Sequence, residues 1–110
     1  MEIMSIIPAR GGSKGIPMKN LKMINGKSLL DYSVNASLKS RFITRTFVSS
    51  DHPKILKKAK KLGAEVIQRP KQLSTDSSHI EPVIEHCLDF LKLKENYSPD
   101  LIILLQNTSP

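Results

Sequence analysis

Four short runs of apolar and β-branched residues alternate with longer stretches in which apolar residues recur at helical spacing. The runs occupy residues 4–8, 43–49, 64–68 and 101–105. Strands that alternate with helices are typical of an open parallel sheet, because each parallel connection needs a crossover segment. The last run has five consecutive apolar residues, which indicates a strand buried on both faces. The sequence therefore predicts an α/β fold with a mainly parallel sheet covered by helices.

Helix boundaries can be predicted from local signals. Ser28 and Asp31 have the spacing of a capping box, so the first helix should begin there. Asp51 can cap the second helix, contribute to a ligand site, or do both. Pro53 suits the first turn of that helix, and Gly63 is a typical stop. A third helix is predicted from an apolar stripe of Ile80, Val83, Ile84, Cys87, Leu88 and Leu91.

Length and composition limit the classes of protein. With 110 residues, 39% of them hydrophobic and 25% charged, the chain is expected to form one globular unit over residues 1–110. No apolar run approaches the length of a membrane span, and the start lacks the features of a signal peptide, so we expect a cytoplasmic protein without a membrane partner. Cys87 is the single cysteine and is interpreted as a small core residue.

The net charge of +7 favours anionic partners. Five lysines crowd the second helix and are interpreted mainly as a solvated face: Lys54, Lys57, Lys58, Lys60 and Lys61. Nucleic acid is the less favoured partner, since aromatic side chains that could stack on bases are few. No metal site is predicted, because His86 and Cys87 are adjacent on a helix and point in different directions.

The loop over residues 9–20 follows the first strand, where ligands of parallel α/β sheets bind. Its glycines free backbone amides, and three cations, Arg10, Lys14 and Lys19, could neutralise most of a triphosphate, with the Ser13 hydroxyl as a further donor. Neither the P-loop pattern nor the dinucleotide fingerprint is present. The alternative is a surface loop whose glycines only make turns.

Residues 9–20 match the pattern Ala-Arg-x-x-Ser-Lys-x-x-x-x-Lys-Asn, and three further motifs follow in order. They are residues 48–51 (Val-Ser-Ser-Asp), residues 69–78 (Arg-Pro, a leucine and Asp-Ser-Ser) and residues 104–110 (Leu-Leu-Gln-x-Thr-Ser-Pro). With these four motifs the chain resembles, over essentially its whole length, the CMP-N-acetylneuraminate synthetases and their relatives for other nonulosonic acids. Asn107 departs from the proline usual in that family.

The resemblance implies a three-layer, Rossmann-like fold of the nucleotide-diphospho-sugar transferase type, and transfer of CMP from CTP to an acid sugar with release of pyrophosphate. It implies catalytic roles for Lys19 and Arg10, with Lys19 polarising the α-phosphate. The implied substrate-binding residues are Arg10, Ser13, Lys14, Lys19, Asn20, Arg69, Ser78 and Gln106.

Members of that family use Mg2+ and form homodimers, and they continue for about as much chain again. The resemblance therefore implies that this chain is the N-terminal, CTP-binding portion, inactive alone, with the metal ligands and much of the sugar pocket beyond Pro110. Two alternatives stay open. The acid sugar could be legionaminic, pseudaminic or a shorter ulosonic acid, or the chain could be a non-catalytic nucleotide-binding or basic interaction module.

Overall fold

The structure is a computed structural model that describes residues 1–11, 21, 23–24, 26–70 and 80–106. Its main sheet contains β1 (Ile3–Pro8), β4 (Arg45–Ser50), β5 (Glu65–Gln68) and β6 (Leu101–Leu104) in the order β5-β4-β1-β6. Every neighbouring pair is parallel. The predicted parallel α/β sheet is confirmed.

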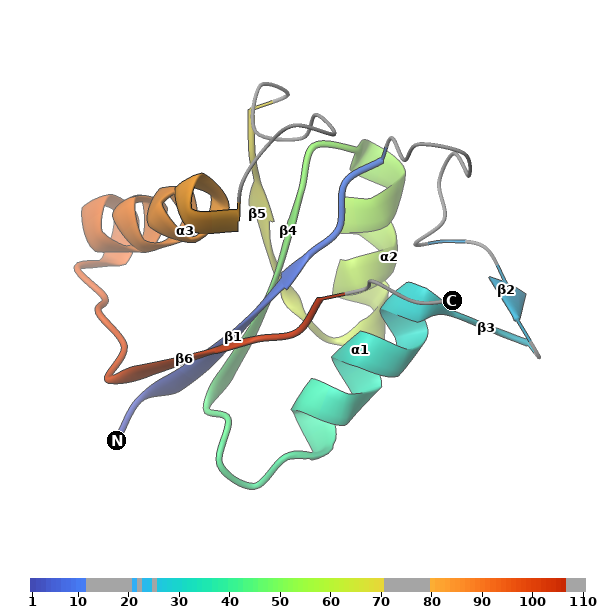
Figure 1. Ribbon diagram of the computed structural model, residues 1–110, viewed down its shortest axis with the longest axis horizontal. Coiled ribbons are helices and arrows are strands. Elements are labelled where there is room, and N and C mark those ends of the chain that lie inside the picture. The colour runs from blue at the N-terminus through green and yellow to red at the C-terminus, as the bar shows by residue number, and fades with distance from the viewer. Residues whose placement is uncertain (12–20, 22, 25, 71–79, 107–110) are drawn as a thin grey trace.

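Helices cover both faces of this sheet, as Figure 1 shows. The first face packs against α1 (Leu29–Lys39) and α2 (Pro53–Leu62), and the second packs against α3 (Ile80–Glu95). Successive strand residues point to opposite faces. Accordingly, Ile7 and Val48 belong to the core under α1 and α2, whereas Ile6 and Phe47 belong to the core under α3. The three predicted layers are present.

Cys87 is fully buried within the core under α3, as predicted. The core under α1 also contains a chain of buried hydroxyl groups. Ser37 Oγ lies 2.7 Å from Ser5 Oγ and 2.6 Å from Thr46 Oγ1. These hydrogen bonds satisfy polar groups that would be costly to bury without partners, and they join α1 to β1 and β4.

The predicted capping box at α1 is present: the Asp31 amide donates to Ser28 Oγ at 3.2 Å, and the Ser28 amide donates to Asp31 Oδ2 at 2.7 Å. Of the alternatives open for Asp51, the N-cap of α2 is not the one present. His52 is the N-cap, with its Nδ1 accepting from the Lys54 amide at 3.1 Å, while Asp51 lies one residue earlier. Gly63 ends α2 with a φ of 104°, in the left-handed region that glycine adopts without strain.

Two further features differ from the sequence-based expectation. A short antiparallel hairpin, β2 (Met23–Ile24) and β3 (Lys27–Ser28), precedes α1 and was not predicted. The expectation that residues 101–105 form a strand buried on both faces was wrong. Leu101 is 52% exposed, and Ile102 and Ile103 are each 37% exposed. Among the described strands β6 lies at the edge of the sheet and pairs only with β1, so its outer side has no neighbour.

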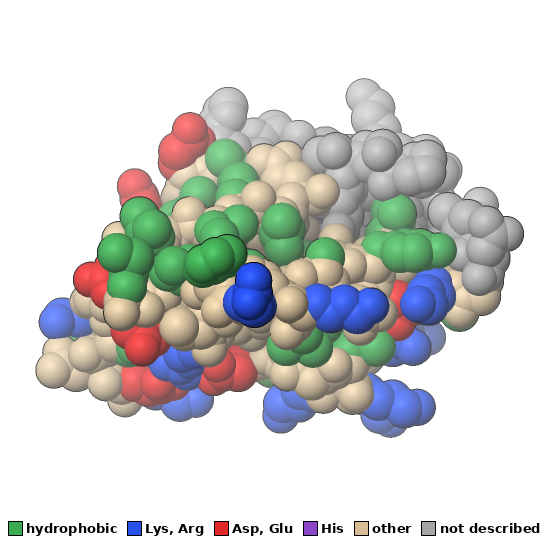
Figure 2. All heavy atoms as spheres, turned by 90° about the horizontal axis from the view of Figure 1, so that it is seen from below, with side chains coloured by type: hydrophobic (Ala, Val, Ile, Leu, Met, Phe, Trp, Pro, Cys, Tyr) green, Lys and Arg blue, Asp and Glu red, His purple; other side chains and the backbone are tan. Residues whose placement is uncertain are grey.

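The amino end of the sheet is held together by a charge network around Arg45. Its guanidinium donates to Glu65 at 2.6 Å and to Glu95 at 3.0 Å, and it stacks on the ring of Tyr97. These hydrogen bonds raise the pKa of Arg45 and lower the pKa of Glu95. Figure 2 views the molecule from below, and in this view most acidic side chains gather at the left, the side on which α3 lies in Figure 1. In the part of the chain that the structure describes, no helix is long and apolar enough to cross a membrane.

Candidate functional site

The carboxyl ends of the four parallel strands meet at one edge of the sheet, opposite the Arg45 network. Backbone hydrogen bonds carry the strand pairing past three of these ends. The Ala9 amide donates to Ser49 O at 2.9 Å, the Arg69 amide to Ser50 O at 3.0 Å, and the Leu105 amide to Ile6 O at 3.0 Å. The residues that follow are therefore fixed at this edge, in the spatial order Arg69, Asp51, Arg10 and Gln106.

Asp51 joins the loops that follow β1 and β4. Its Oδ1 accepts a hydrogen bond of 2.9 Å from the backbone amide of Gly11. Gly11 also packs closely on His52, the residue after Asp51. A Cβ atom added to Gly11 would lie 2.8 Å from the His52 side chain. The start of the first loop therefore requires glycine for close approach, and the Asp51 carboxylate fixes its backbone.

Arg69 is a buried cation at the same edge, with only 5% of its surface exposed. Burial lowers the pKa of its guanidinium, the nearby Asp51 carboxylate opposes that shift, and the positive charge of Arg10 adds to it. Within the described part of the chain, Arg69 Nε has no hydrogen-bond partner. A buried cation with an open donor is costly by itself, but it provides a suitable contact for an anion.

Cys87 lies on α3, near enough to this cation for the two groups to interact electrostatically, and sequence reasoning did not predict that proximity. Burial raises the pKa of the Cys87 thiol, while the Ser49 hydroxyl and the Arg69 guanidinium oppose that shift. The thiol of Cys87 therefore lies within electrostatic range of the Arg69 guanidinium. Its position on the buried stripe was the only available signal, and that stripe predicts core packing but not a neighbour from another element.

Three of the predicted site residues are described, and all three follow strands at this edge: Arg10, Arg69 and Gln106. Arg10 and Arg69 influence each other electrostatically, whereas Gln106 is exposed at the end of β6. The remaining predicted residues lie outside the described part of the chain: Ser13, Lys14, Lys19, Asn20 and Ser78. The role of Asp51 was left open from sequence, and the structure places it between the two arginines along the edge.

The described residues do not amount to a magnesium site. Asp51 is the one carboxylate among them that directly follows a strand at this edge, and one of its oxygens accepts from Gly11. No group of three or more His, Cys, Asp or Glu side chains among the described residues could hold a metal ion. Mg2+ is usually bound through one or two carboxylates together with substrate phosphates, so among the described strand ends Asp51 could contribute one ligand, and the others would come from the nucleotide and from water.

Several proteins are similar to this chain along nearly its whole length. An N-acylneuraminate cytidylyltransferase of Oncorhynchus mykiss is 41% identical over 108 residues, which are 98% of this chain and 24% of that protein. A pseudaminic acid cytidylyltransferase of Campylobacter jejuni is 37% identical, over 100% of this chain and 47% of that protein. A CMP-N,N'-diacetyllegionaminic acid synthase of Legionella pneumophila is 38% identical, with the same coverage. The chain thus spans from about a quarter to about half of these relatives.

Solved structures share the fold. A CMP:2-keto-3-deoxy-manno-octonic acid synthetase complexed with CTP matches with a TM-score of 0.75 at 22% identity, covering 97% of this chain and 40% of that one. A cytidylyltransferase of Leptospira borgpetersenii matches with a TM-score of 0.67 at 24% identity, covering 97% and 42%. The family described as "Cytidylyltransferase" matches residues 4–110. This chain belongs to the cytidylyltransferase family.

Proposed function

We propose that this chain is the CTP-binding portion of a CMP-sugar synthetase, which transfers CMP from CTP to a nonulosonic acid and releases pyrophosphate. Membership of the cytidylyltransferase family supports the class of reaction. The acid sugars named for the relatives, N-acylneuraminate, pseudaminic acid and N,N'-diacetyllegionaminic acid, support an acid sugar as the acceptor. Which of these acids is used depends on residues that recognise the sugar, and we assign none of them.

The observation that carries this proposal is the buried Arg69 guanidinium with its open Nε donor. It lies at the carboxyl edge of the sheet with Arg10, and Asp51, whose charge acts on Arg69, accepts a hydrogen bond from the Gly11 amide at the start of the first loop. The Asp51 carboxylate partly offsets the burial of Arg69, and a further anion at this site would stabilise both cations. A nucleotide triphosphate supplies that anion, so we place its phosphates between the first loop and Arg69.

The chemistry follows from positioning and charge. The anomeric hydroxyl of the sugar attacks the α-phosphorus in line, and the bond from that phosphorus to the pyrophosphate oxygen breaks. Arg10 and Arg69 stabilise the negative charge on the phosphates. We assign to Lys19 the polarisation of the α-phosphate, and the remaining contacts with the nucleotide to Ser13, Lys14, Asn20, Ser78 and Gln106.

Magnesium bound with the nucleotide would share the charge of the phosphates. The described residues offer at most the second oxygen of Asp51 to it. We further propose that the whole protein is a homodimer, as the resemblance to nonulosonic acid synthetases implies, and that it is cytoplasmic. The use of magnesium, the homodimer and the cytoplasmic location concern the complete enzyme, and all three are independent of the role of Arg69.

The proposal can be tested by calorimetric titration of the chain with CTP, UTP and duplex DNA in the presence of magnesium. CTP is expected to bind more tightly than UTP, and Arg69→Met should weaken CTP binding by about tenfold or more, because a charge-assisted contact is lost while side-chain volume is retained. Arg41→Met is the matched control, since Arg41 is exposed after the end of α1, away from the carboxyl edge.

Equal affinity for CTP, UTP and DNA would favour a basic interaction module and overturn the enzyme proposal. Equal weakening by Arg69→Met and Arg41→Met would remove Arg69 from the nucleotide site. Thermal unfolding of both variants, recorded alongside, separates lost binding from lost folding.

A further inference from the structure

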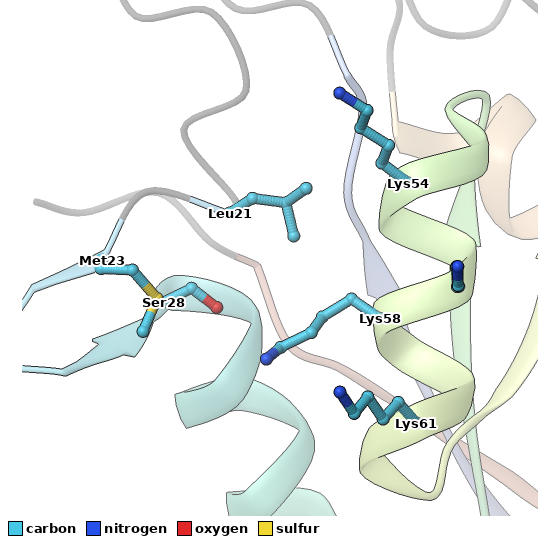
Figure 3. Close-up of a pocket in the computed structure, with 7 residues that line it drawn as sticks. Leu21, Met23, Ser28, Lys54, Lys58 and Lys61 are labelled. Atoms are coloured by element: carbon cyan, nitrogen blue, oxygen red, sulfur yellow. The ribbon is translucent and has the colours of Figure 1, made fainter.

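A second basic site lies beside the hairpin, on the α1 and α2 side of the sheet. It is a hollow of about 340 Å³ lined by four lysines of α2 together with Leu21, Met23 and Ser28. The lysines are Lys54, Lys57, Lys58 and Lys61. In Figure 3 the side chains of Lys58 and Lys61 extend from α2 across to α1, and Leu21 and Met23 face them from the segment before α1.

The four lysines form one face of the helix. Their numbers follow i, i+3, i+4 and i+7 spacing, so their side chains lie over one another in two rows. The face extends over roughly 10 Å along the axis, at about 1.5 Å per residue. Like charges at this spacing destabilise a helix, so the arrangement is unfavourable without a counter-charge.

The described residues supply little of that counter-charge. Lys58 Nζ lies 3.8 Å from Asp31 Oδ1, and this is the one ion pair that the lysines of α2 make within the described part of the chain. Glu65 and Glu95 are engaged by Arg45 at the amino end of the sheet. Around the hollow, the positive charge of the lysines therefore exceeds the negative charge of the described carboxylates, as it does over the whole chain.

The chemistry of the lining indicates the ligand. Lysine ammonium groups bind phosphate as point charges, and four of them are among the described residues that line this hollow. The volume is at the lower end of small-molecule sites, too small for a duplex. We propose that the hollow binds a chain of two or three linked phosphate groups, inorganic or attached to a nucleoside, at a site separate from the nucleotide site around Arg69.

The position of the hollow gives such binding a consequence. Helix α2 begins directly after β4, at the carboxyl edge, so its lysine face leads away from the nucleotide site along α2, with Lys54 at the near end. A cationic face of this kind raises the local concentration of phosphate anions. The proposed reaction consumes one polyphosphate and releases another, and only this functional link rests on the proposed function.

The test uses Met23 as a local reporter, because its side chain lines the hollow and is 55% exposed. The chain is labelled with 13C at the methionine methyl groups, the Met23 signal is assigned with Met23→Leu, and inorganic tripolyphosphate is added at low ionic strength. The Met23 signal should shift in a saturable manner. Lys57→Gln with Lys61→Gln should weaken that binding by about tenfold or more.

Lys60→Gln with Lys92→Gln is the matched control. It removes the same charge from exposed lysines of α2 and α3 that do not line the hollow, and it should change the affinity by less than about twofold. If the two pairs of substitutions weakened tripolyphosphate binding equally, the effect would be due to net charge alone, and the proposal would be overturned. A Met23 signal that responds to duplex DNA and not to tripolyphosphate would overturn it in favour of a nucleic-acid surface.

Titrations with pyrophosphate and with CTP distinguish the inorganic from the nucleoside-linked source of the phosphates. Arg69→Met separates this proposal from the proposed function, because it should leave the Met23 titration with tripolyphosphate unchanged. A chain that shows no preference for CTP but a saturable Met23 shift would refute the synthetase and retain the hollow.

Discussion

Asp51 makes two electrostatic contributions at the candidate site, and they can be separated by substitution. Its carboxylate accepts the Gly11 amide at 2.9 Å, and its charge partly compensates the buried Arg69 guanidinium. Removing one partner from a buried polar pair leaves the other uncompensated, which is usually more costly than losing both. The carboxylate therefore fixes the start of the first loop before any ligand binds.

We expect Asp51→Ala to lower the free energy of unfolding by about 1–3 kcal/mol, because it leaves the Gly11 amide and Arg69 without this partner. Asp51→Asn keeps an acceptor oxygen for Gly11 and should cost less. Urea unfolding measures the free energies, and hydrogen exchange of the Gly11 amide reports the loop.

Asp100→Ala is the control for Asp51, because Asp100 accepts the Glu2 amide at 2.6 Å, near the amino end of the sheet. It should leave exchange at Gly11 unchanged. Protection of the Gly11 amide that survives Asp51→Ala would show that the hydrogen bond does not hold the loop.

At the scale of the elements, helix caps behave differently according to how local their partners are. The box of Ser28 and Asp31 is complete within four residues and was predicted correctly. Asp51 and His52 compete at the start of α2, and the competition is decided by Gly11, which is 40 positions away in the sequence. An N-cap can thus be predicted from sequence where the side chain of the capping residue does not accept a hydrogen bond from a residue far away in the chain.

The box at α1 should make stability depend on pH. Burial tends to raise the pKa of Asp31, but hydrogen bonds from the Ser28 amide and hydroxyl, with the charges of Lys58 and Lys27, lower it below the ordinary value of 3.8. A carboxyl with a lowered folded-state pKa stabilises the fold above its unfolded pKa, and that contribution is lost as the pH falls through the folded pKa.

Asp31→Asn is therefore expected to cost about 1 kcal/mol of unfolding free energy at neutral pH, and progressively less below about pH 4. Urea unfolding at several pH values measures the difference from the unsubstituted chain. Asp89→Asn, an exposed carboxylate on α3, should cost little at any pH. If the loss of unfolding free energy caused by Asp31→Asn did not depend on pH, the effect would be due to the packing and hydrogen-bond geometry of the side chain and not to its charge.

At the scale of the whole molecule, the edge strand β6 is the most exposed apolar element of the described sheet. Leu101, Ile102 and Ile103 are all exposed, and an apolar edge of this kind can pair with another chain. We expect the 110-residue chain to self-associate as its concentration rises, and Ile102→Lys to suppress that association. Sedimentation velocity over a range of concentrations measures the effect.

Leu93→Lys is the comparison for the edge, since Leu93 is an isolated exposed side chain on α3, with 88% of its surface exposed. Suppression by this variant as strong as by Ile102→Lys would place the association elsewhere. A chain that remains monomeric at every concentration would show that the edge is protected.

The sequence alone determined the order of strands and helices in the main fold and the placement of Arg10, Arg69 and Gln106 after strands. It also determined the end of α2 at Gly63, and the start of α2 to within one residue. These features depend on short-range spacing, capping groups and the topology of parallel sheets. The hairpin was missed because its strands are only two residues long and carry no periodic signal.

Tertiary structure alone decided which of these residues meet. It put β1 between β4 and β6, left β6 at the edge, buried Arg69 within electrostatic range of Cys87, and drew the Asp51 carboxylate to Gly11. It also brought the hairpin opposite the lysines of α2 to form the hollow. Each of these outcomes depends on contacts between elements that are distant in sequence, and local propensity carries no information about such contacts.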